Sequence, residues 1–167
     1  VTDHQGATET AEIQIAGVGT NDAPVAGADV VAKLEEGGSA IKGQLTSTDL
    51  DDDATAKFSI TEGADAPAGF EINSDGSYSF DPSDEAYDHL NVGDSTVLTI
   101  PVTVTDDNGA TDTSQIQITV VGTNDAPVAG ADVSSRLEEG ASAIKGQLTS
   151  SDLDDDATAK FSVSEGT

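Results

Sequence analysis

Residues 98–120, LTIPVTVTDDNGATDTSQIQITV, decide the fold of this chain. Apolar residues alternate with threonine or glutamine in both halves, from Leu98 to Val104 and from Ile116 to Val120. A period of two is typical of a β-strand that buries one face. Between the halves lies Asp106-Asp107-Asn108-Gly109, and its Asn-Gly pair is a strong hairpin signal. The segment therefore predicts two strands joined by a tight turn.

Shorter runs of the same kind fill most of the preceding 70 or so residues. Residues 70–80 carry Asn73-Ser74-Asp75-Gly76 between alternating apolar residues, which predicts a second hairpin. Further strands are predicted at residues 30–34, 41–45 and 58–60. Residues 83–90 alone favour a helical turn, and Pro101 indicates that its strand lies at a sheet edge or contains a bulge. About seven short strands, spaced by roughly a dozen residues, are typical of an all-β sandwich.

The chain repeats itself at an offset of 103 residues. Residues 20–64 align without a gap with residues 123–167, and 37 of the 45 positions are identical. Residues 1–19 match residues 104–122 at the same offset, with 12 of 19 identical. We therefore expect a C-terminal hairpin of one repeat in residues 1–20, a complete sandwich in 21–123, and the N-terminal portion of another repeat in 124–167. A unit of about 100 residues is large enough to form its own hydrophobic core, so we expect the array to consist of separate tandem domains.

Composition limits the partners of such domains. There are 32 Asp and Glu residues against 6 Lys and Arg, and the formal net charge is −26. A surface this acidic repels nucleic acid and anionic membranes, whereas its hard carboxylate oxygens suit Ca²⁺. The alternative is an acidic surface that serves solubility alone. The chain contains no cysteine and no apolar run long enough to cross a bilayer, so we expect neither disulfides nor membrane insertion.

Acidic residues cluster in four places that the predicted strand order brings together. The linker Thr123-Asn124-Asp125-Ala126-Pro127-Val128 repeats Thr20-Asn21-Asp22-Ala23-Pro24-Val25 and separates successive units. If the strands run up and down in order, the Asp49–Asp53 loop and the Asp106 turn return to the linker end, and the Glu35-Glu36 pair can lie there too. Crowded carboxylates repel one another, and a calcium ion with six to eight oxygen ligands removes that cost.

These elements define the candidate calcium ligands. Taken in both copies, they are Asn21, Asp22, Glu35, Glu36, Asp49, Asp51, Asp53, Asp106, Asn124, Asp125, Glu138, Glu139, Asp152, Asp154 and Asp156. An EF-hand is excluded, because the loop that starts at Asp49 has Ala54 in place of the required glycine. For each aspartate run alone, a solvated turn is the alternative reading.

The order of these motifs resembles the calcium-binding order of cadherin repeats. The words are Glu-Glu-Gly, Thr-Asp-Leu-Asp-Asp-Asp, Thr-Asp-Asp-Asn-Gly and Thr-Asn-Asp-Ala-Pro. The chain resembles more closely the bacterial cadherin-like repeats, including the VCBS type, of giant RTX adhesins. The resemblance covers the whole chain and implies a Greek-key β-sandwich with calcium clamped between tandem domains. It also implies an acidic donor at the far end of the preceding domain, for which Asp84, Glu85 and Asp88 are the candidates.

The resemblance implies an extender role and not an enzymatic one. Such repeats are secreted by a type I channel, fold outside the bacterial cell and project an adhesive tip for cell adhesion or biofilm formation. The expected partners are neighbouring repeats of the same chain, joined through calcium-bridged linkers in a monomeric array. A calcium-dependent carbohydrate- or surface-binding module is the alternative, although the chain has no Trp and only two Tyr and four Phe. Catalysis by paired carboxylates such as Asp51 and Asp53 is a weaker alternative.

Overall fold

The structure is a computed structural model that describes residues 1–163. Its strands are β1 (Val25–Ala26), β2 (Val30–Glu35), β3 (Ile41–Gln44), β4 (Ser47–Thr48), β5 (Lys57–Ile60), β6 (Phe70–Ile72), β7 (Ser77–Phe80), β8 (Ser95–Thr105), β9 (Thr111–Val121), β10 (Val128–Ala129) and β11 (Ser150–Ser151). Within the described residues no helix is long and apolar enough to cross a membrane.

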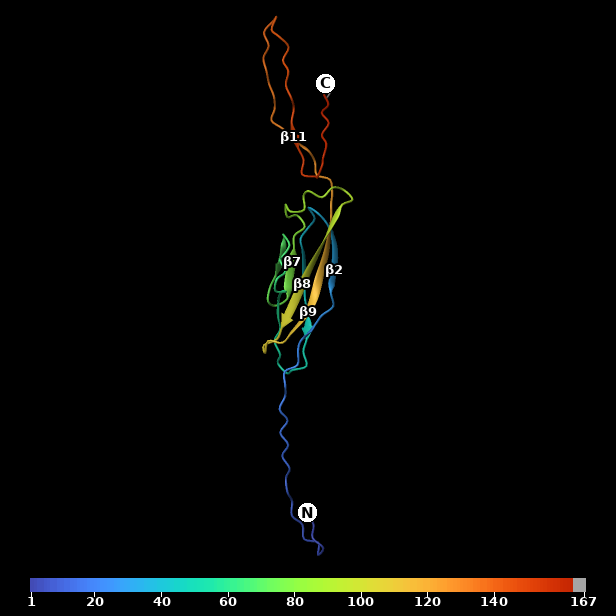
Figure 1. The fold of residues 1–167 in the computed structure, drawn as a ribbon, viewed down its shortest axis with the longest axis vertical. Coiled ribbons are helices and arrows are strands. Elements are labelled where there is room, and N and C mark those ends of the chain that lie inside the picture. The colour runs from blue at the N-terminus through green and yellow to red at the C-terminus, as the bar shows by residue number, and fades with distance from the viewer. Residues whose placement is uncertain (164–167) are drawn as a thin grey trace.

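Two sheets pack face to face in the middle of an elongated molecule (Figure 1). One sheet has the strand order β2-β9-β8-β5 and the other has the order β3-β7-β6, while β1-β4 and β10-β11 form short separate pairs. The β8–β9 hairpin places Ile100 opposite Ile116 and Leu98 opposite Ile118. The predicted all-β sandwich and its final hairpin are confirmed.

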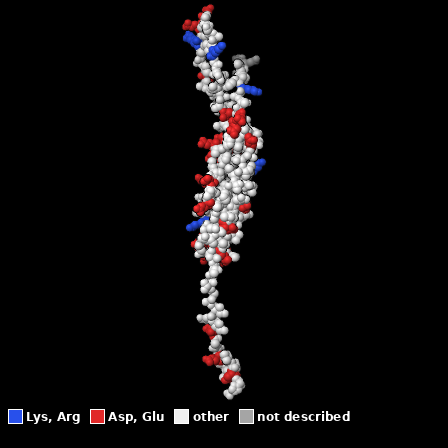
Figure 2. Space-filling model, viewed as in Figure 1, with Lys and Arg blue, Asp and Glu red and all other residues white. Residues whose placement is uncertain are grey.

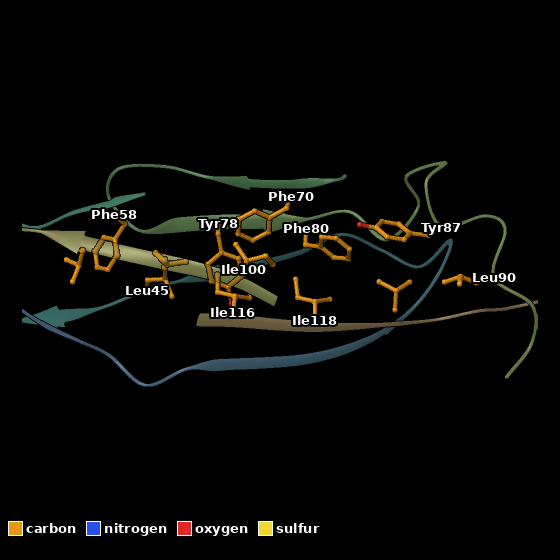
Figure 3. Packing of buried hydrophobic residues seen from close by; sticks show 13 residues of the cluster. Leu45, Phe58, Phe70, Tyr78, Phe80, Tyr87, Leu90, Ile100, Ile116 and Ile118 are labelled. Atoms are coloured by element: carbon orange, nitrogen blue, oxygen red, sulfur yellow. The ribbon is translucent and has the colours of Figure 1, made fainter. Parts of the chain in front are cut away.

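The core fills the space between the sheets (Figure 3). Every second residue is buried from Ile100 to Val104 in β8 and from Ile116 to Val120 in β9, and Ile100, Ile116 and Ile118 have no exposed surface. The facing sheet contributes Phe80, whose ring lies 5.7 Å from that of Tyr87. The alternation in residues 98–120 thus gives the sandwich its buried face, as a period of two requires.

One strand pairing differs from the predicted order. β2 runs parallel to β9, with Val30 opposite Ile116 and Glu35 opposite Val121. β1 pairs antiparallel with β4 instead, so the chain changes partners between Ala26 and Val30. The expectation that the strands run up and down in order is therefore wrong. Its consequence is that β2 and β9 end at the same end of the sandwich.

Pro101 occupies an interior strand, because β8 lies between β9 and β5. The Thr61 amide, directly after β5, donates to the Pro101 carbonyl at 2.9 Å. Because the N–H and the carbonyl of one strand residue point toward the same neighbour, the N–H that Pro101 lacks would also have faced the β5 side. The β5 ladder ends at Ile60, one residue before the position where Pro101 would have to donate. The predicted edge position is wrong, and β8 pairs with β9 through Pro101 without the predicted alternative of a bulge. The proline instead coincides with the end of the β5 ladder.

Residues 83–90 form two successive turns and not a helical turn. The Tyr87 amide donates to the Asp84 carbonyl and the Leu90 amide to the Tyr87 carbonyl, each at 3.0 Å. Tyr87 is buried, and its hydroxyl donates to the Ala68 carbonyl at 2.8 Å. The buried tyrosine and leucine fix the path of this segment at the end of the sandwich nearest residue 123.

The two ends of the chain leave opposite ends of the sandwich (Figure 1). Of the strands at the beginning of the sandwich, residues 124–163 repeat only one pair. β10 pairs with β11 in the same register as β1 with β4, so that Val128 lies opposite Ser151 as Val25 lies opposite Thr48. The domain boundaries at 20–21 and 123–124 remain predictions, and the last four residues of the third segment lie outside the described residues.

Candidate metal centre between the sandwich and the following segment

The first linker contacts two of the predicted acidic elements at the start of the sandwich. The Asn21 side-chain amide donates to Asp106 Oδ2 at 2.9 Å, and the Asp22 amide donates to Asp51 Oδ2 at 2.8 Å. Asp106 Oδ1 accepts from the Asn108 and Ala110 amides at 2.9 and 2.8 Å. The Asn21 hydrogen bond above all, followed by these backbone bonds, holds the pKa of Asp106 below its ordinary value. The buried Asp106 carboxylate is therefore satisfied by protein donors alone.

The second linker meets a different set of carboxylates. One oxygen each from Glu36, Asp125 and Asp154 lies within 4.8 Å of the other two. Glu36 comes from the sandwich, Asp125 from the linker, and Asp154 from the segment that follows. Figure 2 shows acidic side chains gathered around this narrow region, where the sandwich passes into residues 124–163. The cluster thus joins three parts of the chain that are far apart in sequence.

Backbone contacts deliver Glu36 to this place. Because β2 parallels β9, the Glu36 amide donates to the Val121 carbonyl at 2.9 Å, and the Gly37 amide donates to the Pro82 carbonyl at 3.0 Å. Gly37 has a φ of +65°, a conformation that glycine adopts without strain, so the chain turns sharply after Glu36. The glutamate side chain is 5% exposed and is held beside the linker by the strand end itself.

Gly122 supports the cluster from the linker side. It is buried between β9 and the linker, and a Cβ on it would collide with the carbonyl oxygens of Leu90 and Asn91. Its counterpart Gly19 has no atom within 4 Å of the same point. The close approach brings the segment that carries Asp88 next to Asp125.

The cluster is short of hydrogen-bond donors. Glu36 Oε1 accepts from the Thr123 hydroxyl at 3.3 Å, and Asp154 Oδ2 accepts from the Asp125 amide at 3.0 Å. The other oxygens, Glu36 Oε2 and Asp154 Oδ1, are buried without any hydrogen-bond partner among the described residues. A buried carboxylate oxygen without a partner is costly, and here one comes from each side of the linker.

Burial and the crowding of these carboxylates also shift the pKa values of Glu36 and Asp125. Burial raises the pKa of Glu36, and the charges of Asp125 and Asp154 raise it further, against the opposing effect of Thr123. Burial also raises the pKa of Asp125, with added repulsion from Asp154, Asp88 and Asp152 in that order. Both shifts mean that negative charge is disfavoured at this site unless a cation compensates it.

The structure divides the predicted ligands between the two ends of the sandwich. Asn21, Asp22, Asp49, Asp51, Asp53 and Asp106 lie at the start of the sandwich, and Glu35, Glu36, Asp88, Asn124, Asp125, Asp152, Asp154 and Asp156 lie at or near its far end. The expectation that all four acidic elements of one repeat gather at one end is wrong for Glu35 and Glu36. The reason is the parallel β2–β9 pairing, which carries them to the following linker.

Several other predicted ligands shape the acidic loop in which they lie, one loop at each end of the sandwich. Asp49 and Asp152 accept the Asp51 and Asp154 amides within their own loops, at 2.9 and 3.1 Å. The exposed Asp53 and Asp156 have φ values of 60° and 56°, where each loop turns. Glu138 and Glu139 are exposed, and their role as ligands stays a prediction. Thr123, which donates to Glu36, was missed by the sequence reasoning, although it is identical in both linkers.

The donor set fits a hard divalent cation. All three central groups are carboxylates, and Asp88 and Asp152 lie close enough to perturb Asp125. Ca²⁺ accepts six to eight oxygen ligands in flexible geometry and tolerates ligands from separate segments. A ligand set without histidine or cysteine disfavours zinc and copper.

Comparisons with known proteins place the sandwich in a family. The model of the bacterial cadherin-like domain matches residues 21–122. No curated protein matches the chain. Among solved structures, extracellular cadherin domains 1–4 of protocadherin gamma B7 match at 18% identity and a TM-score of 0.49, over 71% of this chain and 29% of that one.

Two other cadherins are similar at the same level. The human desmocollin-1 ectodomain matches at 21% identity and a TM-score of 0.46, over 94% of this chain and 32% of that one. Drosophila N-cadherin EC1-4 matches at 15% identity and a TM-score of 0.42, over 66% of this chain and 28% of that one. The chain thus corresponds to about a third or less of each of these cadherin structures. On the match of residues 21–122, the chain belongs to the bacterial cadherin-like domain family, whose members are extracellular adhesion-type structural modules and not a known enzyme family.

Proposed function

We propose that this chain is a calcium-rigidified extender segment of a large bacterial surface adhesin. Calcium binds between successive repeats and braces them end to end, and the braced array carries a distal binding region away from the cell. The motifs shared with VCBS-type repeats favour an RTX adhesin, exported by type I secretion and folded outside the cell. Neighbouring repeats of the same chain are its structural partners, and the array is monomeric.

The observation that carries the proposal is the pair of buried, unpartnered oxygens on Glu36 and Asp154. They belong to different repeats and lie in one cluster with Asp125 of the linker. A cation coordinated by both would satisfy them and offset the repulsion that raises the pKa of Glu36 and Asp125. Because its ligands come from both sides of the linker, the ion would also lower the freedom of the joint.

The expected stabilisation is modest for each site. Extracellular calcium sites have dissociation constants on the order of 10⁻⁴ M, and millimolar calcium then adds roughly 1.4 kcal/mol for each occupied site. Small domains have unfolding free energies of about 5–15 kcal/mol, so several ions per joint would change the stability measurably. Calcium therefore acts as an environmental switch: the joint is flexible without calcium and stiff at the millimolar calcium outside the cell.

Calcium titration of chelator-stripped protein tests the proposal, with Glu36→Gln and Glu139→Gln as a matched pair. Glu139 is the counterpart of Glu36 at the 103-residue offset, but it is exposed. Glu36→Gln should weaken calcium binding at least about tenfold in calorimetry, because it removes a charged ligand. Glu139→Gln should leave the affinity unchanged.

Small-angle X-ray scattering provides the structural readout. Calcium should shift the distribution of interatomic distances in the wild-type chain to larger values and make it narrower, and Glu36→Gln should abolish that change. An absence of binding heat together with an unchanged thermal midpoint in calcium and in chelator would overturn the proposal.

A further inference from the structure

The Asp-Leu-Asp-Asp-Asp loop occurs twice in the chain with the same sequence and the same local structure. In both copies the third residue's amide donates to the first aspartate, at 2.9 Å in residues 49–53 and 3.1 Å in residues 152–156. The last aspartate of each has a positive φ, 60° and 56°. Local contacts therefore determine the conformation of the loop, whether or not a complete sandwich precedes it in the chain.

The two copies differ in what lies against them. Leu50, in the first copy, is 84% exposed, whereas Leu153, in the second, is 60% exposed. The Asp155 amide donates to the His89 carbonyl of the preceding sandwich at 3.0 Å. Its counterpart Asp52 makes no backbone hydrogen bond of this kind within residues 1–163. The comparison isolates a contact that exists only where a complete sandwich precedes the loop.

Leu153 lines a shallow groove at the end of that sandwich together with Ala68, Ala86 and His89, and the acidic Asp84, Glu85 and Asp88 complete the lining. Ala68 is tied to the core of the sandwich, because the hydroxyl of the buried Tyr87 donates to its carbonyl at 2.8 Å. The His89 carbonyl that accepts the Asp155 amide lies one residue before the buried Leu90. The receiving surface is thus part of the folded sandwich and does not depend on the following repeat.

We propose that Leu153 and the Asp155 amide dock the following repeat onto the groove between Ala68 and His89, independently of metal. A leucine in a groove and a directed hydrogen bond two residues later can be satisfied together at only one rotation about the linker. That rotation is also the one that places Asp154 beside Glu36 and Asp125. The contact orients the joint in advance, which lowers the ordering that any later ligand of the joint must impose. The inference does not rest on calcium binding, since every measurement below is made in chelator.

Leu153→Ser tests the contact, with Leu50→Ser as the matched control. Leu153 is less exposed than Leu50 by about a quarter of a leucine's surface, and losing that apolar burial corresponds to a roughly fivefold change in the docking equilibrium. In chelator, protection of the Asp155 amide from hydrogen exchange should fall about fivefold in Leu153→Ser and stay unchanged in Leu50→Ser. Leu153→Met should retain the protection, because it keeps an apolar side chain of similar volume.

Spin labels give a second readout in the same buffer. The chain has no cysteine, so Ser39→Cys and Thr158→Cys, both at exposed positions, can carry a label pair across the joint. The distance distribution should be narrow in the parent and in Leu50→Ser, and broad in Leu153→Ser, with the melting of the sandwich unchanged in all three. A distribution that is equally broad in the parent, or that Leu153→Ser leaves narrow, overturns the proposal. So does an Asp155 amide that already exchanges in the parent at the rate of an unstructured chain.

Discussion

The linkers at residues 20–25 and 123–128 have the same sequence but lie in different surroundings. In the first, Pro24 is buried against the complete sandwich that follows, while Asp22 is exposed. In the second, Asp125 is half-buried beside the complete sandwich that precedes it, while Pro127 is exposed. Each linker therefore shows one half of the environment that a joint between two complete repeats would have.

The candidate metal centre therefore belongs to neither repeat alone. The first linker holds an Asp106 carboxylate that amide donors satisfy, with a lowered pKa. The second holds Glu36 and Asp125, whose pKa values are raised because their carboxylates are buried together. Since the copies are related by a constant offset of 103 residues, every residue at one joint has a counterpart that serves as its control.

The largest difference is expected for Ile118→Ala against Ile15→Ala. Ile118 has no exposed surface and packs in the core, whereas its counterpart Ile15 is 90% exposed. Truncation of a buried isoleucine costs about 2–5 kcal/mol of unfolding free energy, and an exposed one close to zero. Urea unfolding of both variants measures the difference. Equal losses would mean that residues 1–19 pack against a core of their own.

Gly122→Ala should have the next largest effect, with Gly19→Ala as its control. A methyl group at Gly122 meets the backbone carbonyls of Leu90 and Asn91, while Gly19 has open space around it. Overpacking of this kind costs typically about 1–3 kcal/mol. The variant should also displace the segment that carries Asp88 and so weaken calcium binding, which calorimetry measures together with denaturant stability. An unchanged affinity would separate Asp88 from the metal centre.

Removal of the buried charge at Glu36 should change how stability depends on pH. Its folded-state pKa is raised, so in chelator the unfolding free energy should be greatest below the ordinary value of 4.5 and fall as the pH rises through the higher folded pKa. Glu36→Gln should flatten this decline, and Glu139→Gln should preserve it. Thermal melting from pH 4.5 to 7.5 measures the slope. A decline that survives in Glu36→Gln would assign it to Asp125 or to another acid.

The fold was predictable from sequence wherever a local pattern decides it. The alternation from Leu98 to Val120 predicts the central hairpin, because side chains of a strand alternate between faces. The parallel pairing of β2 with β9 was not predictable in this way, since nothing in Val30–Glu35 specifies the direction of its partner. Pro101 misled for a related reason. Its lost N–H can be accommodated where a neighbouring strand ends, and sequence alone does not reveal that end.

The contacts of the candidate site also separate into those that the local sequence predicts and those that depend on strand topology. The Asn21 contact with Asp106 and the Asp22 contact with Asp51 follow from adjacency in a repeat that returns to its starting end. The partnership of Glu36 with Asp154 crosses 118 residues and a linker, and it depends on a strand direction that the sequence does not state. Residue type indicates which side chains are candidate ligands, whereas topology decides which of them meet.

The smallest expected effect is that of Asn21→Ala against Asn124→Ala. Both side chains donate to the carbonyl of the next residue, at 2.9 and 2.6 Å, but Asn21 also donates to Asp106. The difference between the two variants therefore isolates one hydrogen bond to a buried carboxylate, worth about 1 kcal/mol at neutral pH. Because that bond lowers the pKa of Asp106, the deficit of Asn21→Ala should shrink as the pH falls through the folded pKa, below 3.8. Carboxyl NMR titration of Asp106 should show its pKa rising in Asn21→Ala alone. An equal loss in both variants would show that the linker turn, and not the contact with Asp106, ties this joint to the sandwich.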